Sequence, residues 1–347
     1  MTTIRNSDMA ERNEGIALLR PILTFSVIMV HFWNSNNKML SNVLNDFISL
    51  SVPVFMLISF FLTESVFSFL SKEKFIRRIR RLGWPYVFWG GANWVALIVT
   101  EKIFNMEIID GFHSLFWQIL TGHAYHVNTP LWYIAVLLWI SLFFFAIFSI
   151  FKRKAVIIIH VIGSCALILQ YSCLNYLLFN NCIFELRYPL GRIAEMFPYA
   201  VLGYDLSYFN FFDWIKLSEI RCIKFKYGTL CLFIILVFFC RDYHVSGFGY
   251  AGFFKIIKAL SLLAFFYLLD FKKFPKKIMV ILHVLEAHTL GVYCLHYVVG
   301  NVLLVIIGKN RVSLNQYVLC ILIYLVCFLF AKAISRIPIK AVQNLVD

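Results

Sequence analysis

Charged residues are scarce in this sequence. Asp, Glu, Lys and Arg make up 14% of its 347 residues, and 61% are hydrophobic, whereas roughly 25% of the residues in an average soluble domain are charged. A water-soluble protein of this length needs more charge to cover its surface. The composition therefore excludes an ordinary soluble enzyme and predicts a chain whose surface lies mostly in lipid.

Cysteine motifs and linkers are also missing. The nine cysteines include no Cys-x-x-Cys pair, and most fall in apolar stretches, where cysteine is commonly a small apolar filler. We therefore predict neither a disulfide framework nor a metal site. The sequence contains no Gly/Ser-rich or Pro-rich linker, so residues 1–347 are predicted to form one domain.

Long apolar runs take up most of the chain. About ten stretches approach the ~20 residues that cross a hydrocarbon core. The fold class predicted from them is an all-α, polytopic helical membrane protein, with no soluble domain beside the bundle. The predicted spans are 16–34, 48–70, 84–100, 131–151, 155–178, 189–209, 227–240, 250–270, 284–307 and 313–334.

The distribution of Lys and Arg predicts the orientation of these spans. Counted from the N-terminus, one set of alternate loops carries 21 of these residues and the other set carries 6. Cytoplasmic loops hold the excess of positive charge, so both termini are predicted to be cytoplasmic. The net charge of +14 reports this topology and does not indicate nucleic-acid binding, because the basic residues are dispersed over six short segments.

Two polar residues interrupt the first apolar run. Arg20 and His31 are eleven positions apart, which on a helix is about 16 Å of rise and leaves them within roughly 20° of one face. An Arg at the centre of a span costs on the order of 3 kcal/mol and usually faces a bundle interior or a cavity. The pair therefore predicts a polar path through the bilayer, and Pro21 is expected in the first turn of this helix.

A dense basic segment precedes the third predicted span. It contains Arg77, Arg78, Arg80 and Arg81. Any cytoplasmic loop of this topology needs Lys or Arg, so the segment can be a topology signal alone. The last four cations of the segment are nevertheless all Arg, whose guanidinium group binds phosphate through two points. The segment is also a candidate site for the phosphates of a nucleotide-like donor.

Three more polar residues lie in later spans. Arg192 and Glu195 are three positions apart in the sixth span, and His296 is isolated in the ninth. A buried Arg–Glu pair can be purely structural, and a helix–helix hydrogen bond is the commonest explanation for a single histidine in a span. His31, near the outer end of its span, can be an interfacial polar group, but imidazole at the end of a polar path is also well suited to move a proton near neutral pH.

At this point the chain resembles the membrane acyltransferase-3 family, whose bacterial members O-acylate surface polysaccharides. The resemblance covers nearly the whole sequence, and its five motifs occur in the family's order. They are Leu19-Arg20 with His31, the segment Val52–Ser59, Arg77–Arg81 leading to Trp84-Pro85-Tyr86, Pro130–Tyr133, and the late Tyr–His element Gly291–His296.

The resemblance implies a membrane O-acyltransferase in the inner (plasma) membrane. The donor would be acyl-CoA, most often acetyl-CoA, which approaches from the cytoplasm as a co-substrate, and the chain would need no bound cofactor. The acceptor would be a hydroxyl of a glycan such as O-antigen or exopolysaccharide. His31 and Arg20 are then the predicted catalytic residues, with His31 as general base. The four arginines would bind the donor. Supporting roles are expected for Ser59, Trp132, Arg192, Glu195, Tyr293 and His296.

A transporter or flippase for a glycan or lipid-linked precursor is the alternative. It would share the helical bundle, the basic inner loops and the charges inside the membrane. Such proteins often show internal repeats or Gly/Pro-broken spans in corresponding halves, and the sequence has neither. A non-catalytic scaffold would not need Arg20 and His31 on one face.

Overall fold

The protein is described by a computed structural model for residues 13–33, 38–104, 130–171, 184–240, 252–271, 274–309 and 315–346. Within these ranges every regular element is a helix. The helices are α1 (Glu14–Phe32), α2 (Lys38–Ile48), α3 (Ser51–Ser68), α4 (Lys72–Phe104), α6 (Trp132–Phe151), η1 (Lys152–Lys154), α7 (Ala155–Tyr171), α9 (Phe184–Tyr208), α10 (Phe211–Lys216), α11 (Glu219–Phe239), α12 (Phe253–Tyr267), α13 (Lys276–Ala287), α14 (Thr289–Lys309), α15 (Gln316–Ser335) and α16 (Lys340–Gln343).

Six helical segments of the described chain are long and apolar enough to cross a membrane. They are Glu14–Phe32, Val43–Ser68, Trp132–Leu169, Glu219–Phe239, Thr289–Ile307 and Gln316–Ser335. The third contains two of the predicted spans, which the basic turn η1 divides into α6 and α7. The remaining predicted spans lie on α4, α9 and α12. The first two of these helices carry several charged residues, and α12 has 15 residues.

Several helix boundaries differ from the predicted spans, and α4, for example, begins at Lys72 although its span was predicted to begin at 84. The seventh span was predicted as 227–240, but α11 begins at Glu219, where Ser218 caps it by accepting a hydrogen bond from the Arg221 N–H. Hydropathy places the boundary too late because Lys and Arg can sit in a helix while their charged ends reach the interface. The predicted span 284–307 is interrupted at His288, which separates α13 from α14.

The start of α1 also corrects the prediction for Pro21. Asn13 caps this helix by accepting a hydrogen bond of 3.0 Å from the Ile16 N–H. The helix therefore begins at Glu14, and Pro21 lies in its interior rather than in its first turn. A proline inside a helix removes one backbone hydrogen bond and favours a kink, and this position directly follows Arg20.

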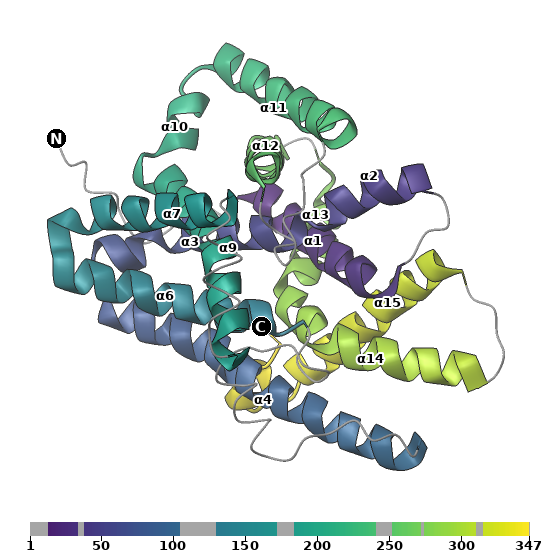
Figure 1. Ribbon diagram of the computed structural model, residues 1–347. Helices are drawn as coiled ribbons and strands as arrows, with labels where there is room; N and C mark the ends of the chain where they lie inside the picture. Colours follow the sequence, from purple (N-terminus) through teal and green to yellow (C-terminus); the bar gives the residue numbers. More distant parts are fainter. Residues whose placement is uncertain are drawn as a thin grey trace.

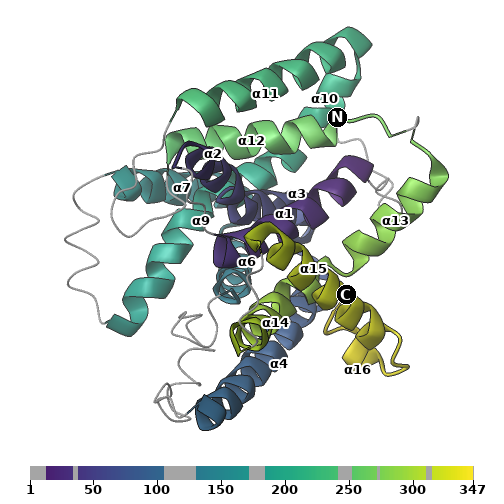
Figure 2. The ribbon, with the colours of Figure 1, turned by 90° about the vertical axis from the view of Figure 1, so that its right-hand side faces the viewer.

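Helix α1 lies at the centre of the bundle (Figures 1 and 2). It packs against α2, α3, α12, α13, α14 and α15. Of its apolar window 61% is buried, compared with 28% for α15 and 17% for α11. The uncovered surfaces of α11 and α15 carry large apolar side chains such as Phe238 and Leu329. These outer faces suit lipid, whereas the polar residues of α1 face other helices.

Helices α3, α6 and α9 form a rigid platform beside α1. Gly203 of α9 lies against the backbone of Leu57 in α3, where a Cβ atom would clash. Phe60 of α3 and Phe144 of α6 pack with their ring centroids 4.7 Å apart, and Tyr204 of α9 joins the same cluster. This packing fixes the faces of α3 and α6 that carry Ser59 and Ser141.

Candidate active site

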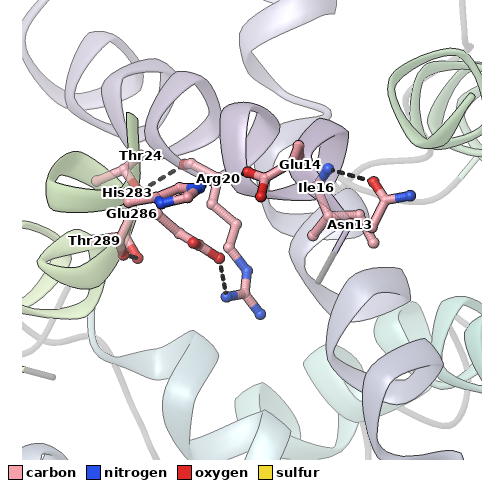
Figure 3. Close-up of polar contacts among 8 residues, drawn as sticks. All are labelled: Asn13, Glu14, Ile16, Arg20, Thr24, His283, Glu286 and Thr289. Atoms are coloured by element: carbon pink, nitrogen blue, oxygen red, sulfur yellow. Dashed lines mark hydrogen bonds and ion pairs between the residues drawn. The ribbon is translucent and has the colours of Figure 1, made fainter. Parts of the chain in front are cut away.

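Arg20 forms an ion pair with a residue that the sequence analysis did not select. Its Nη1 lies 2.9 Å from Oε1 of Glu286, which is in the last turn of α13 (Figure 3). The carboxylate neutralises a guanidinium group that sits between helices, where an unpaired charge is costly. Glu286 falls inside the predicted span 284–307, so an acidic residue at membrane depth was the signal that could have found it.

A second ion pair joins the same two helices. Nε2 of His283 lies 2.7 Å from Oε2 of Glu14, one turn before Glu286 on α13 (Figure 3). His283 and Glu286 are three positions apart and therefore share one face of α13. Helix α13 thus holds the N-terminal half of α1 at two points, and the inner one orients Arg20.

The four arginines at the start of α4 do not share one environment. Arg77, Arg80 and Arg81 are exposed, whereas Arg78 is half-buried. Arg78 donates hydrogen bonds to Ser59 Oγ at 2.9 Å and to Ser141 Oγ at 3.1 Å. The structure therefore directs Arg78 between α3 and α6, and Ser141 is a further contact that the sequence did not indicate.

Arg81 connects this segment to Arg20. Its charge acts on both Arg20 and Arg78, so Arg81 lies within electrostatic range of each of these two guanidinium groups. Glu286 is the acidic neighbour of this group. We call Arg20, Arg78 and Arg81 the arginine cluster. Three such groups with one carboxylate form a positively charged site, which suits a ligand with several phosphates.

His31 lies at the other end of α1, in the last turn of the helix. Its ring centroid is 5.4 Å from that of His296 and 5.8 Å from that of Tyr297, both on α14. Arg20 contacts α13 and His31 contacts α14, and α14 follows α13 after one residue. Arg20 and His31 therefore both lie on the side of α1 that packs against α13 and α14.

Aromatic rings join the two ends of α1. Tyr133 of α6 lies in electrostatic range of Arg20 and Arg78, and its ring centroid is 6.0 Å from that of Tyr293. Tyr293 is in turn 5.8 Å from His296. We call Tyr133, Tyr293, His296 and His31 the aromatic row. The row runs from the arginine cluster to His31 and consists of side chains that carry a polar atom.

Tyr293 also fixes α14 against the segment that precedes α6. Its hydroxyl donates a short hydrogen bond to the carbonyl oxygen of Pro130. His296 makes a second contact inside α14, with Nδ1 2.6 Å from the Tyr293 carbonyl oxygen. The late Tyr–His element is therefore built into the bundle and also faces His31.

Arg192 and Glu195 form a pair on α9, as their spacing allows. The Arg192 Nη1 lies 2.6 Å from Glu195 Oε2, and the Glu195 side chain is fully buried. The guanidinium group of Arg192 lies over the ring of Trp132, 4.9 Å from its centroid. Trp132 is next to Tyr133 in α6, so this pair lies beside the aromatic row and not in the arginine cluster.

Two further polar pairs lie away from these residues. Lys258 of α12, which is fully buried, forms an ion pair with Asp46 of α2. Nε2 of His160 on α7 is 2.9 Å from Oδ2 of Asp205 on α9, and the sequence analysis did not select either residue. In the part of the chain that the structure describes, no group of three or more His, Cys, Asp or Glu residues could hold a metal ion. Among the described residues, the arginine cluster and the aromatic row are thus the polar groups that lie along α1, and other polar pairs lie elsewhere in the bundle.

These features define a class of protein: a multi-pass helical membrane protein whose polar site lies along α1, where α1 packs against other helices of the bundle. A model of the family described as "Acyltransferase domain" matches residues 13–332. The chain therefore belongs to the acyltransferase-3 family, and it is a membrane acyltransferase. No curated protein and no solved structure shows detectable similarity to it.

Proposed function

We propose that this acyltransferase moves an acetyl group from cytoplasmic acetyl-CoA to a hydroxyl of a surface or lipid-linked polysaccharide, such as O-antigen or exopolysaccharide. The observation that carries the proposal is the aromatic row. It joins a cluster of three guanidinium groups, suited to the phosphates of CoA, to His31, an imidazole suited to proton transfer.

The donor site in this proposal is the cytoplasmic end of α4 together with Arg20. Arg81 lies within electrostatic range of both Arg20 and Arg78, and the exposed Arg77 and Arg80 would widen the positive surface toward the cytoplasm. Guanidinium groups grip phosphate oxygens at two points each. CoA carries several phosphates, so it can use the cluster and the exposed arginines at the same time.

His31 acts as the general base in this proposal. The acceptor hydroxyl oxygen attacks the thioester carbonyl carbon, His31 takes the hydroxyl proton, and the bond between carbon and sulfur breaks. The proton then passes from His31 to the CoA sulfur, so that the products are an O-acetyl ester and free CoA. The resting protein needs no bound cofactor for these steps.

The topology proposed from the distribution of Lys and Arg agrees with this division of roles. Both termini and the start of α4 would be cytoplasmic, and the outer end of α1 would face the opposite side of the plasma membrane. The donor then enters near Arg20 and the glycan reaches His31 from outside. Arg192, Glu195 and Trp132 would support the row from the side of α9 and α6.

Transfer of a radiolabelled acetyl group tests the proposed function. Membranes that contain the glycan are incubated with purified protein and labelled acetyl-CoA, and CoA thiol release is followed in parallel. We expect label in the glycan fraction that mild base releases as acetate, because an ester is labile to base. A transporter or flippase would consume no thioester.

His31→Ala is the matched control for this assay. General acid–base assistance is worth roughly 10²–10⁴ in rate, so the variant should lose that much activity while it inserts and accumulates normally. The proposal fails if the wild-type protein releases no thiol, and the role of His31 is wrong if the variant keeps activity within a few-fold of wild type.

A further inference from the structure

His296 has a fixed pattern of hydrogens on its ring. Nδ1 lies 2.6 Å from the carbonyl oxygen of Tyr293, one turn earlier in α14. A carbonyl oxygen only accepts hydrogen bonds, so Nδ1 carries the hydrogen. In the neutral imidazole the other nitrogen, Nε2, then carries the lone pair. The helix itself therefore prepares His296 to accept a hydrogen bond through Nε2.

That acceptor is left without a partner. The side chain of His296 is fully buried, and its Nε2 has no hydrogen-bond partner among the described residues. Buried polar atoms are paired in the great majority of cases, because an unpaired one loses its bonds to water without replacement. An unused acceptor at this place in the bundle therefore points to a hydrogen-bond donor that reaches Nε2 through a small movement of a neighbouring side chain.

The ring of His31 is the neighbour that can supply this donor. Two imidazole rings in N–H···N contact have centroids about 5 Å apart, since the two nitrogens are then about 3 Å apart. The centroids of His31 and His296 are 5.4 Å apart. Catalytic hydrogen bonds are often long in the absence of substrate and shorten when it binds, so a small ring rotation would complete this contact.

Close packing of α1 and α14 holds the two rings together. Gly300 lies one turn after His296, and a Cβ atom at this position would clash with the ring of Phe32, the residue next to His31. The absence of a side chain at Gly300 therefore lets the outer end of α1 approach α14. Tyr297 packs edge-on against His31 from the same helix.

We propose that His296 is a positioning residue for His31: Nε2 of His296 accepts the N–H of His31 and holds the other His31 nitrogen toward the acceptor hydroxyl. This inference rests on the proposed function and adds a second imidazole to it. A catalytic base is commonly oriented by a third group in this manner.

The contact also supports the charged form of His31. When His31 takes the hydroxyl proton, its ring becomes an imidazolium, and hydrogen bonds from charged donors are stronger than neutral ones. His296 gains no proton in this scheme. The hydroxyl proton still passes through His31 to the CoA sulfur, while the ester bond forms and the thioester bond breaks.

Two substitutions separate positioning from packing. His296→Gln keeps a neutral side chain with an acceptor oxygen, whereas His296→Leu fills a similar space without any acceptor. We expect His296→Leu to lower kcat roughly 10- to 100-fold, the size of one charge-assisted hydrogen bond, and His296→Gln to recover most of that loss. The KM for acetyl-CoA should stay constant in both, because the arginine cluster lies at the other end of the aromatic row.

A double-mutant cycle tests the coupling to His31. In a His31→Gln background, His296→Leu should have little further effect on kcat, because residues that act as a unit are strongly non-additive. His160→Leu is the matched control: it removes another helix histidine, on α7, which packs against α6 and α9, and it should keep kcat within a few-fold of wild type. Thermal unfolding in detergent is followed for every variant.

The inference is wrong if His296→Leu keeps the wild-type kcat, or if its effect has the same size with and without His31. It is also wrong if Gln and Leu lower kcat and the unfolding temperature together and equally, because that result means a packing role. A wild-type protein that transfers no acetyl group would refute the proposed function, and this inference with it.

Discussion

Arg20 of α1 and Glu286 of α13 form an ion pair of 2.9 Å although they are 266 positions apart in the sequence. The guanidinium group that begins the polar path is thus oriented by the helix that leads into α14. Glu286 therefore orients Arg20, whose guanidinium group lies within electrostatic range of Arg81. This ion pair also leads to a first testable prediction.

Glu286→Gln should lower kcat/KM for acetyl-CoA. The substitution keeps the shape of the side chain and removes its charge, so Arg20 loses a charge-assisted hydrogen bond worth about 1.5–3 kcal/mol, or about 10- to 150-fold. Glu14→Gln is the matched control, because it breaks the ion pair with His283, whose partners are both more exposed. Exposed pairs contribute about 0–1 kcal/mol, and equal effects of the two variants would contradict this prediction.

Arginine-to-lysine exchange in α4 should separate donor binding from topology. Replacing Arg77, Arg78, Arg80 and Arg81 with Lys keeps all four charges and hence the orientation of the loop, but ammonium groups lack the planar two-point grip on phosphate. We expect a higher KM for acetyl-CoA. Arg78→Lys alone should account for much of the change, because a single ammonium group cannot reproduce the fork between Ser59 and Ser141.

Lys74→Arg serves as the control for that series, since it changes a cation of the same segment that has no proposed contact with the donor. The apparent KM is measured in membranes that contain equal amounts of each variant. If the four-lysine protein matched wild type in both KM and turnover, the arginines would be a topology signal only. The donor site would then have to lie around Arg20 and Arg192.

Gly300→Ala should reduce turnover without weakening the binding of acetyl-CoA. The new methyl group would meet the Phe32 ring and push α14 away from the C-terminal end of α1, which would separate His31 from His296. Gly228→Ala is the matched control, because a Cβ atom at that position of α11 has open space around it. Kinetics of both variants check the prediction, and a similar change in both would speak against a special contact at Gly300.

Reporter fusions test the orientation. A reporter placed after Asp347 should be cytoplasmic, and one inserted near Asn128, which lies outside the described residues, should be extracytoplasmic. The reason is the excess of Lys and Arg in one set of loops, 21 against 6. Accessibility of each reporter in intact cells is the measurement. A C-terminal reporter found outside would reverse the side from which the donor is proposed to enter.

Much of the bundle could be predicted because apolar length is a local property of the sequence. The uninterrupted runs that became α1, α6 and α15 agree with their helices within a few residues. The predicted boundaries were wrong where a helix includes charged or polar residues. Helix α11 begins within a basic segment, and α2 forms in a stretch that was read as an outer loop.

Half of the candidate site was accessible from the sequence, and the other half was not. Arg20 and His31 were found because both lie on one helix, whose spacing fixes their relative direction. Glu286 and Ser141 were not found, because each contacts its partner from a distant helix. The spacing of residues along the sequence does not indicate contacts between helices that are far apart in the chain. The burial of His296 beside His31 likewise became visible only once α14 was placed against α1.

The central place of α1 has a consequence for how the protein is made. Helix α1, which carries Arg20 and His31, is synthesised before α13 and α14, which carry their partners Glu286 and His296. In an unfinished chain Arg20 therefore lacks the carboxylate of Glu286, and His31 lacks the neighbouring ring of His296. The proposed site therefore has all of its residues only once α14 has been synthesised.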